Sequence, residues 1–588
     1  MNPTKHPQSH KSPPTIAYLV AMPSPASHLF EITLEIGNWR SPVLDLKMPV
    51  WCPGSYLVRE YSRHLQDFTA TARDSSLPLP SRKLSKNHWQ LSTKDIAAIT
   101  IRYRVFANDL TVRTNHLDTT HGYFNGAALF FYLPGWEKQR IRVKIATPYP
   151  HWQVTTPLPE LEGSPHTFEA EDFDTLVDSP FEIGSHQVYN FEVLGKSHQL
   201  AIWGKGNAQA EKIIEDTKKI IATEAALYGE LPYDRYLFLL HLSHQGFGGL
   251  EHKNCCSLNY PRFGFRKTGQ YNRFMQLITH EFFHLWNIKR IRPKALEEFD
   301  YDRENYTTSL WFCEGVTSYY DMVIPLRAKI YDIPTFLEIL SKEISRFLTT
   351  PGRKVQPLHE SSFDAWIKLY RRDAHSDNSQ ISYYLKGEMV SLVLDLLIRS
   401  RHENRRSLDH VMKQMWQDFG KDEIGYTPSQ LQAVIESVAG IDLTDFFARY
   451  IHGTDELPLA QYLSYFGLVL SPVMEKEPVP YLGIKAKVEN GSDKILFVTA
   501  GSPAAVAGID PGSELLALDG IRVTAEQLNE RLGNYRAGDT VAITLFHGDE
   551  LKTLAVTLAE SQPSRYQVVT CTHPTGSQKQ NFAGWLRQ

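Results

Sequence analysis

The chain has 588 residues, 42% hydrophobic and 22% charged, which is too long for one hydrophobic core and indicates three or four globular domains. A net charge of -4 gives no electrostatic basis for binding nucleic acid or an anionic membrane surface. The five cysteines are too few and scattered for a disulfide framework, and none has the C-x-x-C spacing of a cysteine zinc site, which indicates a reducing compartment.

The N-terminus is polar and proline-rich, without the apolar core of a secretory signal. We expect residues 1–14 to be a disordered tail. No run of about 18 apolar residues occurs, so no transmembrane helix is predicted. These features favour a cytoplasmic protein without a membrane partner.

Residues 15–190 form short apolar or alternating runs separated by Gly, Pro, Asn and Asp, the pattern of an all-β domain. The pattern changes near Asn207, a candidate N-cap for a helix over 208–230. A buried strand over 236–243 follows. These patterns therefore predict a β domain in the first half of the chain, followed by the start of a mixed α/β domain.

Two further helices are predicted over 272–291, ended by Pro293, and over 310–330, and others follow up to about 455. We therefore assign 191–460 to one mixed α/β domain with a helical C-terminal part. Short strands with a single helix return over 476–562 and predict a small separate domain. The polar tail over 563–588 is expected to be loose.

The strongest local signal is the segment His280-Glu281-Phe282-Phe283-His284. Positions i and i+4 lie on one face of a helix, so both imidazoles can reach one ion. Glu281 projects beside them and can take a proton from an attacking water. The motif lies inside a predicted amphipathic helix, which argues against a chance match and predicts a zinc site.

A catalytic zinc takes three protein ligands and keeps one position open. Glu314 is the candidate third ligand, because its neighbours are apolar and a buried carboxylate needs a partner. The alternative for Glu314 is a surface or ion-paired glutamate. Asp321, seven residues further along, is a candidate to orient a ligand histidine by accepting a hydrogen bond from the ring nitrogen that does not bind the metal.

The segments HEFFHLWNIKRIRP and DYDRENYTTSLWFCEGVTSYYD closely resemble the glycyl aminopeptidase family of metallopeptidases with a C-terminal PDZ domain. This family of gluzincins is related to aminopeptidase N and leukotriene-A4 hydrolase. WCPGSYLVREYSRH (51–64) and DLTVRTNHLDTTHGYFNG (109–126) resemble its N-terminal β domain. The resemblance implies a thermolysin-like catalytic domain over 191–460. The loop between the two helices, rich in Arg and Lys, is longer than in aminopeptidase N.

The resemblance also implies a substrate-binding strand. Gly248, Gly249, Glu251 and His252 match a GGxEH segment whose glutamate would hold the free α-amine of the substrate. An exopeptidase needs such a carboxylate, and an extended strand can align the peptide. Taken without the resemblance, Glu251 is more simply a loop carboxylate that follows two glycines.

A catalytic tyrosine is implied in the same way. Tyr384 lies in a YxKG element and would donate its phenol to the oxyanion of the tetrahedral intermediate. The neighbouring Tyr383 is the alternative donor. A tyrosine that only packs at a helix start is the simpler interpretation of either residue.

Tyr481, Leu482, Gly483 and Ile484, followed by VTAGSPAAVAGIDPG, resemble the carboxylate-binding loop of a PDZ domain of the bacterial protease type. Such a loop captures the C-terminal carboxylate of a peptide that adds as a strand to the domain. The alternative is a domain that only docks on the catalytic body and binds nothing.

These observations predict a multidomain α+β chain that acts as a zinc-dependent aminopeptidase with one zinc ion per chain. Its substrates would be peptides with a free N-terminus, and the resemblance implies a preference for small residues such as Gly or Ala. The alternatives are an endopeptidase guided by its PDZ domain and a non-catalytic peptide-binding protein with a relic site.

Overall fold

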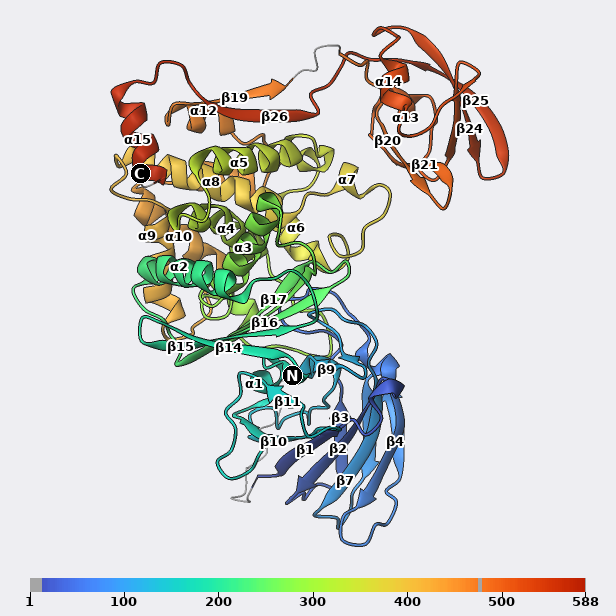
Figure 1. Cartoon of the computed structure of the whole chain (residues 1–588), viewed down its shortest axis with the longest axis vertical. Coiled ribbons are helices and arrows are strands. Elements are labelled where there is room, and N and C mark those ends of the chain that lie inside the picture. Colours follow the sequence, from blue (N-terminus) through green and yellow to red (C-terminus); the bar gives the residue numbers. More distant parts are fainter. Residues whose placement is uncertain (1–12, 474–477, 587–588) are drawn as a thin grey trace, which may run out of the picture. The chain divides into compact units, whose positions relative to one another are not determined.

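The computed structural model describes residues 13–473 and 478–586 (Figure 1). The chain divides into two compact units. The first holds the residues up to Asn305 together with Phe419–Gly425, and the second holds Tyr306–Asp418 together with the residues from Tyr426 onward. None of the described helices is long and apolar enough to cross a membrane. Most of the predicted tail over 1–14 lies outside the described residues.

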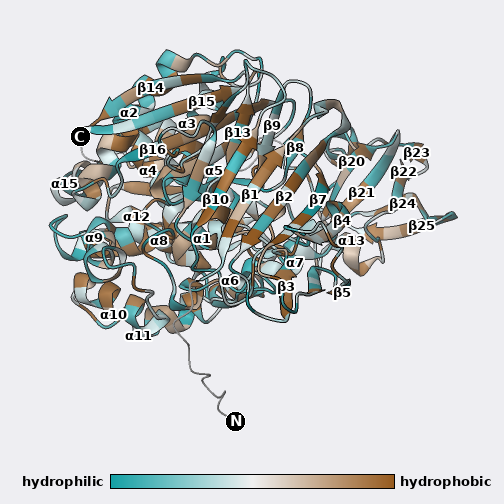
Figure 2. Cartoon of the chain, turned by 90° about the horizontal axis from the view of Figure 1, so that it is seen from below, coloured by the Kyte–Doolittle hydropathy of each residue, from teal (hydrophilic) through white to brown (hydrophobic). Residues whose placement is uncertain are grey.

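The N-terminal part of the first unit is made of β-sheets, as predicted. Every second side chain of the first strand is buried, namely Ile16, Tyr18 and Val20, because successive side chains of a strand point to opposite faces. The neighbouring strand β2 alternates in hydropathy as well, and Figure 2 shows brown and teal bands along it. The largest sheet has the order β12-β10-β1-β2-β7-β4, with bounds β1 (Thr15–Ala21), β2 (Leu29–Gly37), β4 (Leu65–Ala72), β7 (Ile99–Phe106), β10 (Ile141–Ala146) and β12 (Thr167–Ala170).

Two smaller sheets and one short helix complete this part. The three-stranded sheet consists of β3 (Val43–Lys47), β6 (His88–Ser92) and β5 (Ser81–Ser85). The four-stranded sheet has the order β11-β13-β9-β8, with β8 (His116–Leu117), β9 (His121–Phe124), β11 (Gln153–Thr155) and β13 (Phe181–Gly184). Helix α1 spans Phe173–Val177.

A five-stranded sheet with two helices forms the rest of the first unit. Its order is β14-β15-β16-β18-β17, and β15, β16 and β18 run parallel. The strands are β14 (Gln187–Val193), β15 (Lys196–Trp203), β16 (Arg235–Ser243), β17 (Gly248–His252) and β18 (Cys255–Pro261), and the helices are α2 (Ala210–Tyr228) and α3 (Thr268–Phe283). Helix α3 packs on β17 and β18, which places the HExxH segment over the antiparallel edge of the sheet.

Two local predictions in this region are wrong. Asn207 does not cap α2, because its side-chain oxygen accepts from the Phe265 amide at 3.3 Å. Helix α3 ends at Phe283, well before Pro293. Ile288 has a φ of 109°, which no α-helix accommodates, and the buried guanidinium of Arg290 donates to the Leu285 carbonyl at 2.9 Å. The chain therefore turns soon after the second histidine.

The second unit has a helical body. A π-helix over Trp311–Gly315 continues directly as α4 (Val316–Arg327). Helix α8 (Tyr383–Arg401) is buried along nearly its whole length, so it forms the centre of this body. The other helices are α5 (Ile333–Leu348), α6 (Leu358–Phe363), α7 (Ser376–Ser379), α9 (Leu408–Met415), α10 (Pro428–Ala439), α11 (Thr444–Phe446) and α12 (Leu459–Ser464).

A small β domain is inserted between two strands of a ribbon. Strand β19 (Leu468–Val473) precedes it, and β26 (Arg565–Thr570) follows it and pairs antiparallel with β19. Figure 1 shows the two strands of this ribbon side by side. The inserted domain contains β20 (Ile484–Glu489), β21 (Ser492–Val498), β22 (Glu514–Leu518), β23 (Ile521–Arg522), β24 (Thr540–His547), β25 (Glu550–Thr557), α13 (Pro503–Val506) and α14 (Leu528–Leu532).

The tail over 563–588 is not loose as predicted. It forms β26 and then helix α15 (Gly576–Leu586). The Val568 amide donates to the Ser341 hydroxyl of α5 at 2.9 Å, and Trp585 is fully buried. The tail is therefore held by strand pairing with β19, by backbone bonds to α5 and by one large buried side chain, although most of its residues are polar.

Candidate active site

Helix α3 carries both histidines of the HExxH segment. The ring centroids of His280 and His284 lie 4.7 Å apart, with an interplanar angle of 88°. His284 is buried, and its Nδ1 lies 2.8 Å from the Asn287 carbonyl, which can only accept. The proton is therefore on Nδ1 and the lone pair is on Nε2, as a metal-ligating histidine requires. This donor set fits a zinc ion.

The turn after α3 is held by Arg290, whose role sequence analysis did not predict. Its buried guanidinium donates to the carbonyls of Leu285, Lys253 and Pro232 and to the side chain of Asn254, at 2.9–3.1 Å. These bonds tie the end of the histidine helix to the loops of the five-stranded sheet. The lone signal in the sequence is the Arg- and Lys-rich segment that follows His284.

Strand β17 passes directly under the predicted base. A Cβ atom built on Gly249 would lie 2.2 Å from the carboxyl carbon of Glu281, so any larger residue there would displace the Glu281 side chain. Glu251, on the same strand, is 5% exposed. One ligand atom from each of Glu251, Glu281 and His284 lies within 4.8 Å of the other two. The structure thus brings the predicted amine-binding carboxylate and the predicted base together.

The N-terminal β domain completes the surroundings of Glu251. A Cβ built on Gly54, at a φ of +83°, would lie 2.6 Å from Glu251 Oε1. Arg113 donates to the Gly249 carbonyl at 3.1 Å. A cavity of about 20 Å³ adjoins the carboxylate, and it is lined by Trp51, Pro53, Gly54, Tyr56, Glu251, Ile288, Lys289, Arg292, Leu296 and Phe299. The segments over 51–64 and 109–126 therefore build the site.

His252 lies at the end of β17 and has a structural partner. Its Nδ1 is 3.1 Å from Asp178, which also accepts from Lys289 at 2.6 Å and from the Lys253 amide at 2.7 Å. Burial alone would raise the pKa of Asp178, but the charge of Lys289 and the bond to His252 lower it below its ordinary value. Asp178 is therefore an anion that joins the end of β17 to the turn after α3.

In the second unit, Glu314 lies on the π-helix and is 2% exposed. This helix crosses α8 at glycines of both elements. A Cβ on Gly315 would lie 2.4 Å from the Cα of Gly387, and a Cβ on Gly387 would lie 2.6 Å from the Trp311 carbonyl oxygen. The backbones are thus in direct contact, which fixes Glu314 relative to the YxKG element.

Tyr383 and Tyr384 begin α8, and their rings stack with centroids 4.7 Å apart. The Tyr370 hydroxyl lies 3.2 Å from that of Tyr383 and 3.1 Å from that of Tyr384. Burial and then the charge of Glu314 raise the pKa of Tyr384, so this phenol lies close to Glu314 and keeps its proton. Tyr370 was not predicted to take part.

Two more carboxyl groups, those of Asp321 and Glu224, lie on helices α4 and α2. Asp321 lies on α4, where its charge adds to burial in raising the pKa of Tyr331. Glu224 on α2 is fully buried, and burial raises its pKa well above the ordinary value while the nearby His280 lowers it. Sequence analysis missed Glu224, although a carboxyl on the apolar face of an amphipathic helix is a usable signal.

Comparison with known proteins decides the family. Family models match over residues 17–185 (Peptidase M61 N-terminal domain), 273–390 (M61 glycyl aminopeptidase) and 480–558 (PDZ domain). The crystal structure of an aminopeptidase N family protein from Idiomarina loihiensis is 33% identical, with a TM-score of 0.91 over 97% of this chain and 100% of that one. The chain belongs to the M61 glycyl aminopeptidase family.

Two other comparisons, with solved structures and with curated proteins, gave the following results. An M1 zinc metallopeptidase from Deinococcus radiodurans is 10% identical, with a TM-score of 0.47 over 76% of this chain and 94% of that one. A search among curated proteins finds no match.

The M61 protein is accordingly a zinc metallopeptidase that acts on peptides and carries a PDZ domain. In its PDZ domain, β20 is an edge strand of the sheet. Gly483, at a φ of +89°, lies immediately before β20, and a Cβ there would lie 2.2 Å from the Cβ of Ser502. Tyr481 pairs with Ala559 through both backbone bonds, which fixes the start of the predicted carboxylate loop.

Proposed function

We propose that this peptidase removes N-terminal residues from peptides, with a preference for small residues such as Gly or Ala. The observation that carries the proposal is the buried carboxylate of Glu251 beside Glu281 and His284. An aminopeptidase needs an anion beside the scissile bond to pair with the α-ammonium group of its substrate. An endopeptidase substrate has no charged amine at that position.

In this proposal His280, His284 and Glu314 hold one zinc ion, with Asp321 in a supporting role. When bound, zinc supplies Lewis acidity toward the scissile carbonyl and the attacking water. Glu281 takes the proton of that water and returns it to the leaving amine. Tyr384 donates its hydroxyl to the oxyanion, since a phenol is protonated at neutral pH.

Strand β17 aligns the peptide in this mechanism. Gly248 and Gly249 leave room for an extended substrate backbone, and Glu251 binds its free amine. His252 does not reach the substrate in this account. It positions the strand through its contact with Asp178.

The test uses purified full-length protein with Gly-p-nitroanilide and Ala-p-nitroanilide. We expect release of p-nitroaniline from both and none from N-acetyl-Ala-p-nitroanilide. Glu281→Gln should lower kcat by at least ~10²-fold, the usual contribution of a general base. Glu251→Gln should chiefly raise KM, and Glu211→Gln, an exposed control on α2, should change neither.

Two outcomes would contradict this proposal. Cleavage of the N-acetylated compound at the rate of the free amine would favour the endopeptidase guided by its PDZ domain. Full activity of Glu281→Gln would remove the assignment of the base. Loss of activity with unchanged zinc content in that variant would instead support the assignment.

A further inference from the structure

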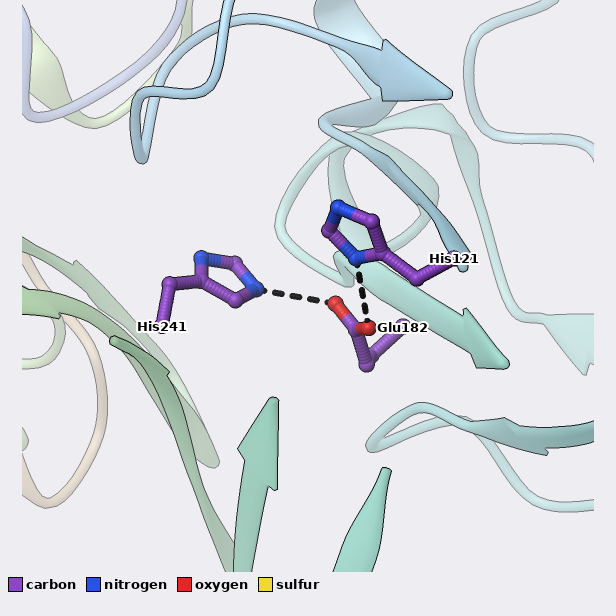
Figure 3. Close-up of side chains that lie close together, drawn as sticks. All are labelled: His121, Glu182 and His241. Carbon is purple, nitrogen blue, oxygen red and sulfur yellow. Dashed lines mark hydrogen bonds and ion pairs between the residues drawn. The ribbon is translucent and has the colours of Figure 1, made fainter. Parts of the chain in front are cut away.

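A second group of histidines surrounds a buried glutamate, in the first unit but outside the proposed catalytic residues. Glu182 Oε1 lies 2.8 Å from His121 Nδ1, and Glu182 Oε2 lies 2.8 Å from His241 Nε2. Figure 3 shows both rings directed at the carboxylate from different sides. The side chains of these residues are at most 2% exposed. Three donors of metal-binding type therefore meet in the interior.

A third histidine points at the same carboxylate. His186 Nδ1 lies 4.0 Å from Glu182 Oε1, and its side chain has no exposed surface. This nitrogen has no hydrogen-bond partner among the described residues. An unsatisfied buried polar atom costs about 1–3 kcal/mol. A cation at the centre of the group would give His186 a partner that the two existing hydrogen bonds do not provide.

The outer nitrogens of two rings are already held in the way that metal-ligating histidines require. His121 Nε2 lies 2.8 Å from His116 Nδ1, and His186 Nε2 lies 2.7 Å from the Thr155 hydroxyl. The indole of Trp203 stacks on the His121 ring at 3.6 Å. Such bonds fix which ring nitrogen faces the ion.

The charge of the group also suits a cation. Burial alone would raise the pKa of Glu182, but His121 and His241 lower it below the ordinary value, so the carboxylate is an anion. An isolated buried anion is unfavourable, and a divalent cation compensates it directly. Imidazole nitrogens with one carboxylate suit zinc and exclude calcium and magnesium, which take oxygen ligands.

We propose that His121, Glu182, His186 and His241 bind a zinc-type divalent ion at a structural site. Ligand atoms of a tetrahedral zinc lie about 3.3 Å apart. Those of His121, Glu182 and His241 lie within 4.8 Å of one another, and His186 Nδ1 lies 4.0 Å from Glu182 Oε1, so the four side chains must move inward to close on the ion. Binding requires that the two ring nitrogens now bonded to Glu182 turn their lone pairs toward the ion, with their protons moved to the opposite ring nitrogen or lost to solvent. Four protein ligands leave no open position, which distinguishes a structural from a catalytic site.

The ion would join two sheets of the first unit. His121 lies on β9 and Glu182 on β13, both in the four-stranded sheet, whereas His241 lies on β16 of the five-stranded sheet. His186 lies in the connection between β13 and β14. The proposed ion therefore links the N-terminal β domain to the sheet that carries strand β17.

The test separates this ion from the proposed catalytic one. The His280→Ala/His284→Ala double variant is loaded with zinc, and unbound zinc is then removed by dialysis. We expect about one equivalent of zinc to remain bound per chain. Cobalt(II) in the same variant should give the visible absorption of a four-coordinate site. Adding His186→Gln should weaken zinc binding at least ~10-fold while leaving both hydrogen bonds of Glu182 intact.

His198→Gln in the same background is the matched control. His198 is also buried, but it bonds to Tyr233 and the Lys196 carbonyl. We expect this variant to keep its zinc and its zinc-dependent rise in Tm. Zinc content near zero in the double variant would overturn the proposal, and so would equal zinc affinity of the His186→Gln and His198→Gln proteins. Neither result would bear on the proposal that His280, His284 and Glu314 bind the catalytic zinc.

Discussion

Lys386 illustrates how a single residue can couple this enzyme to pH. It lies in the YxKG element beside Tyr384 and is only 1% exposed, with its ammonium 3.4 Å from the Gly453 carbonyl. Burial lowers the pKa of Lys386 to about 8, although Glu456 and Asp455 act in the opposite direction. The native state therefore holds a charge that is better solvated in the unfolded chain.

We predict that Lys386→Met stabilises the protein, and more so at pH 7 than at pH 10. An unfolded lysine titrates near ~10.4, so between pH 8 and that value the unfolded state binds more protons and wild-type stability rises with pH. At pH 7 both states are protonated, and the wild type carries the full cost of burial. The gain of the variant should be about 2 kcal/mol larger at pH 7.

Urea unfolding at the two pH values measures this difference. Lys342→Met is the control, because Lys342 is exposed on α5. A gain that is equal at both pH values would contradict the lowered pKa.

At the scale of elements, the contact between the π-helix and α8 places two predicted catalytic groups together. The sequence shows a glycine after Glu314 and another in the YxKG element, but no local pattern predicts that they touch. In the structure the two backbones touch, since a Cβ built on Gly315 would lie 2.4 Å from the Cα of Gly387. π-helical segments often occur at functional sites, and here one carries Glu314.

Gly315→Ala should therefore impair the site. The added methyl group meets backbone atoms of Gly387, which cannot move aside as a flexible side chain would. We expect a stability loss of about 1–3 kcal/mol from overpacking, together with weaker zinc binding and at least ~10²-fold lower kcat/KM.

Gly269→Ala is the control, since nothing lies within 4 Å of a Cβ at that position on α3. Zinc titration and p-nitroanilide kinetics on both variants measure the effect. Wild-type zinc affinity in Gly315→Ala would show that the contact does not position Glu314.

At the scale of the whole molecule, the chain returns to its helical body after the PDZ domain. Strand β26 pairs with β19, and α15 packs its Trp585 into the body, where the indole donates to the Tyr319 hydroxyl at 2.9 Å. Tyr319 lies on α4, the helix that continues from the one carrying Glu314. Asn378 also bonds the backbone of Val498 and Ala500, at 2.9 Å each. The PDZ domain is thus joined to the second unit by the β19–β26 ribbon on either side of it and by the two bonds of Asn378.

Trp585→Ala should destabilise the second unit by about 3–5 kcal/mol, the usual cost of emptying a buried tryptophan site. Trp136→Ala, at a residue 36% exposed, should cost far less. Thermal unfolding of both variants measures the difference. An unchanged Tm in Trp585→Ala would mean that α15 contributes nothing to the helical body.

The sequence by itself determined what depends on local periodicity. Two histidines four residues apart share a helix face whatever surrounds them, and alternating runs form strands. These rules predicted the strand-rich and helical regions, the small separate domain over 476–562 and the helix that carries the HExxH segment. The thermolysin-like catalytic domain and the PDZ domain were predicted from the resemblance to a known family. They failed at the turn after α3, which Arg290 ties to Pro232 and Asn254 far away in the sequence. The rules of local periodicity also failed at the polar tail, which pairs with β19 and buries Trp585.

Only the tertiary structure decided which distant residues meet. Gly54 lies in a turn of the N-terminal β domain and Glu251 on β17, and His121 and His241 are separated from Glu182 by 61 and 59 residues. No periodic pattern in the sequence indicates such pairs, because their contact depends on how whole sheets pack. Local spacing therefore determined the chemistry of the predicted metal ligands, and packing decided what surrounds them.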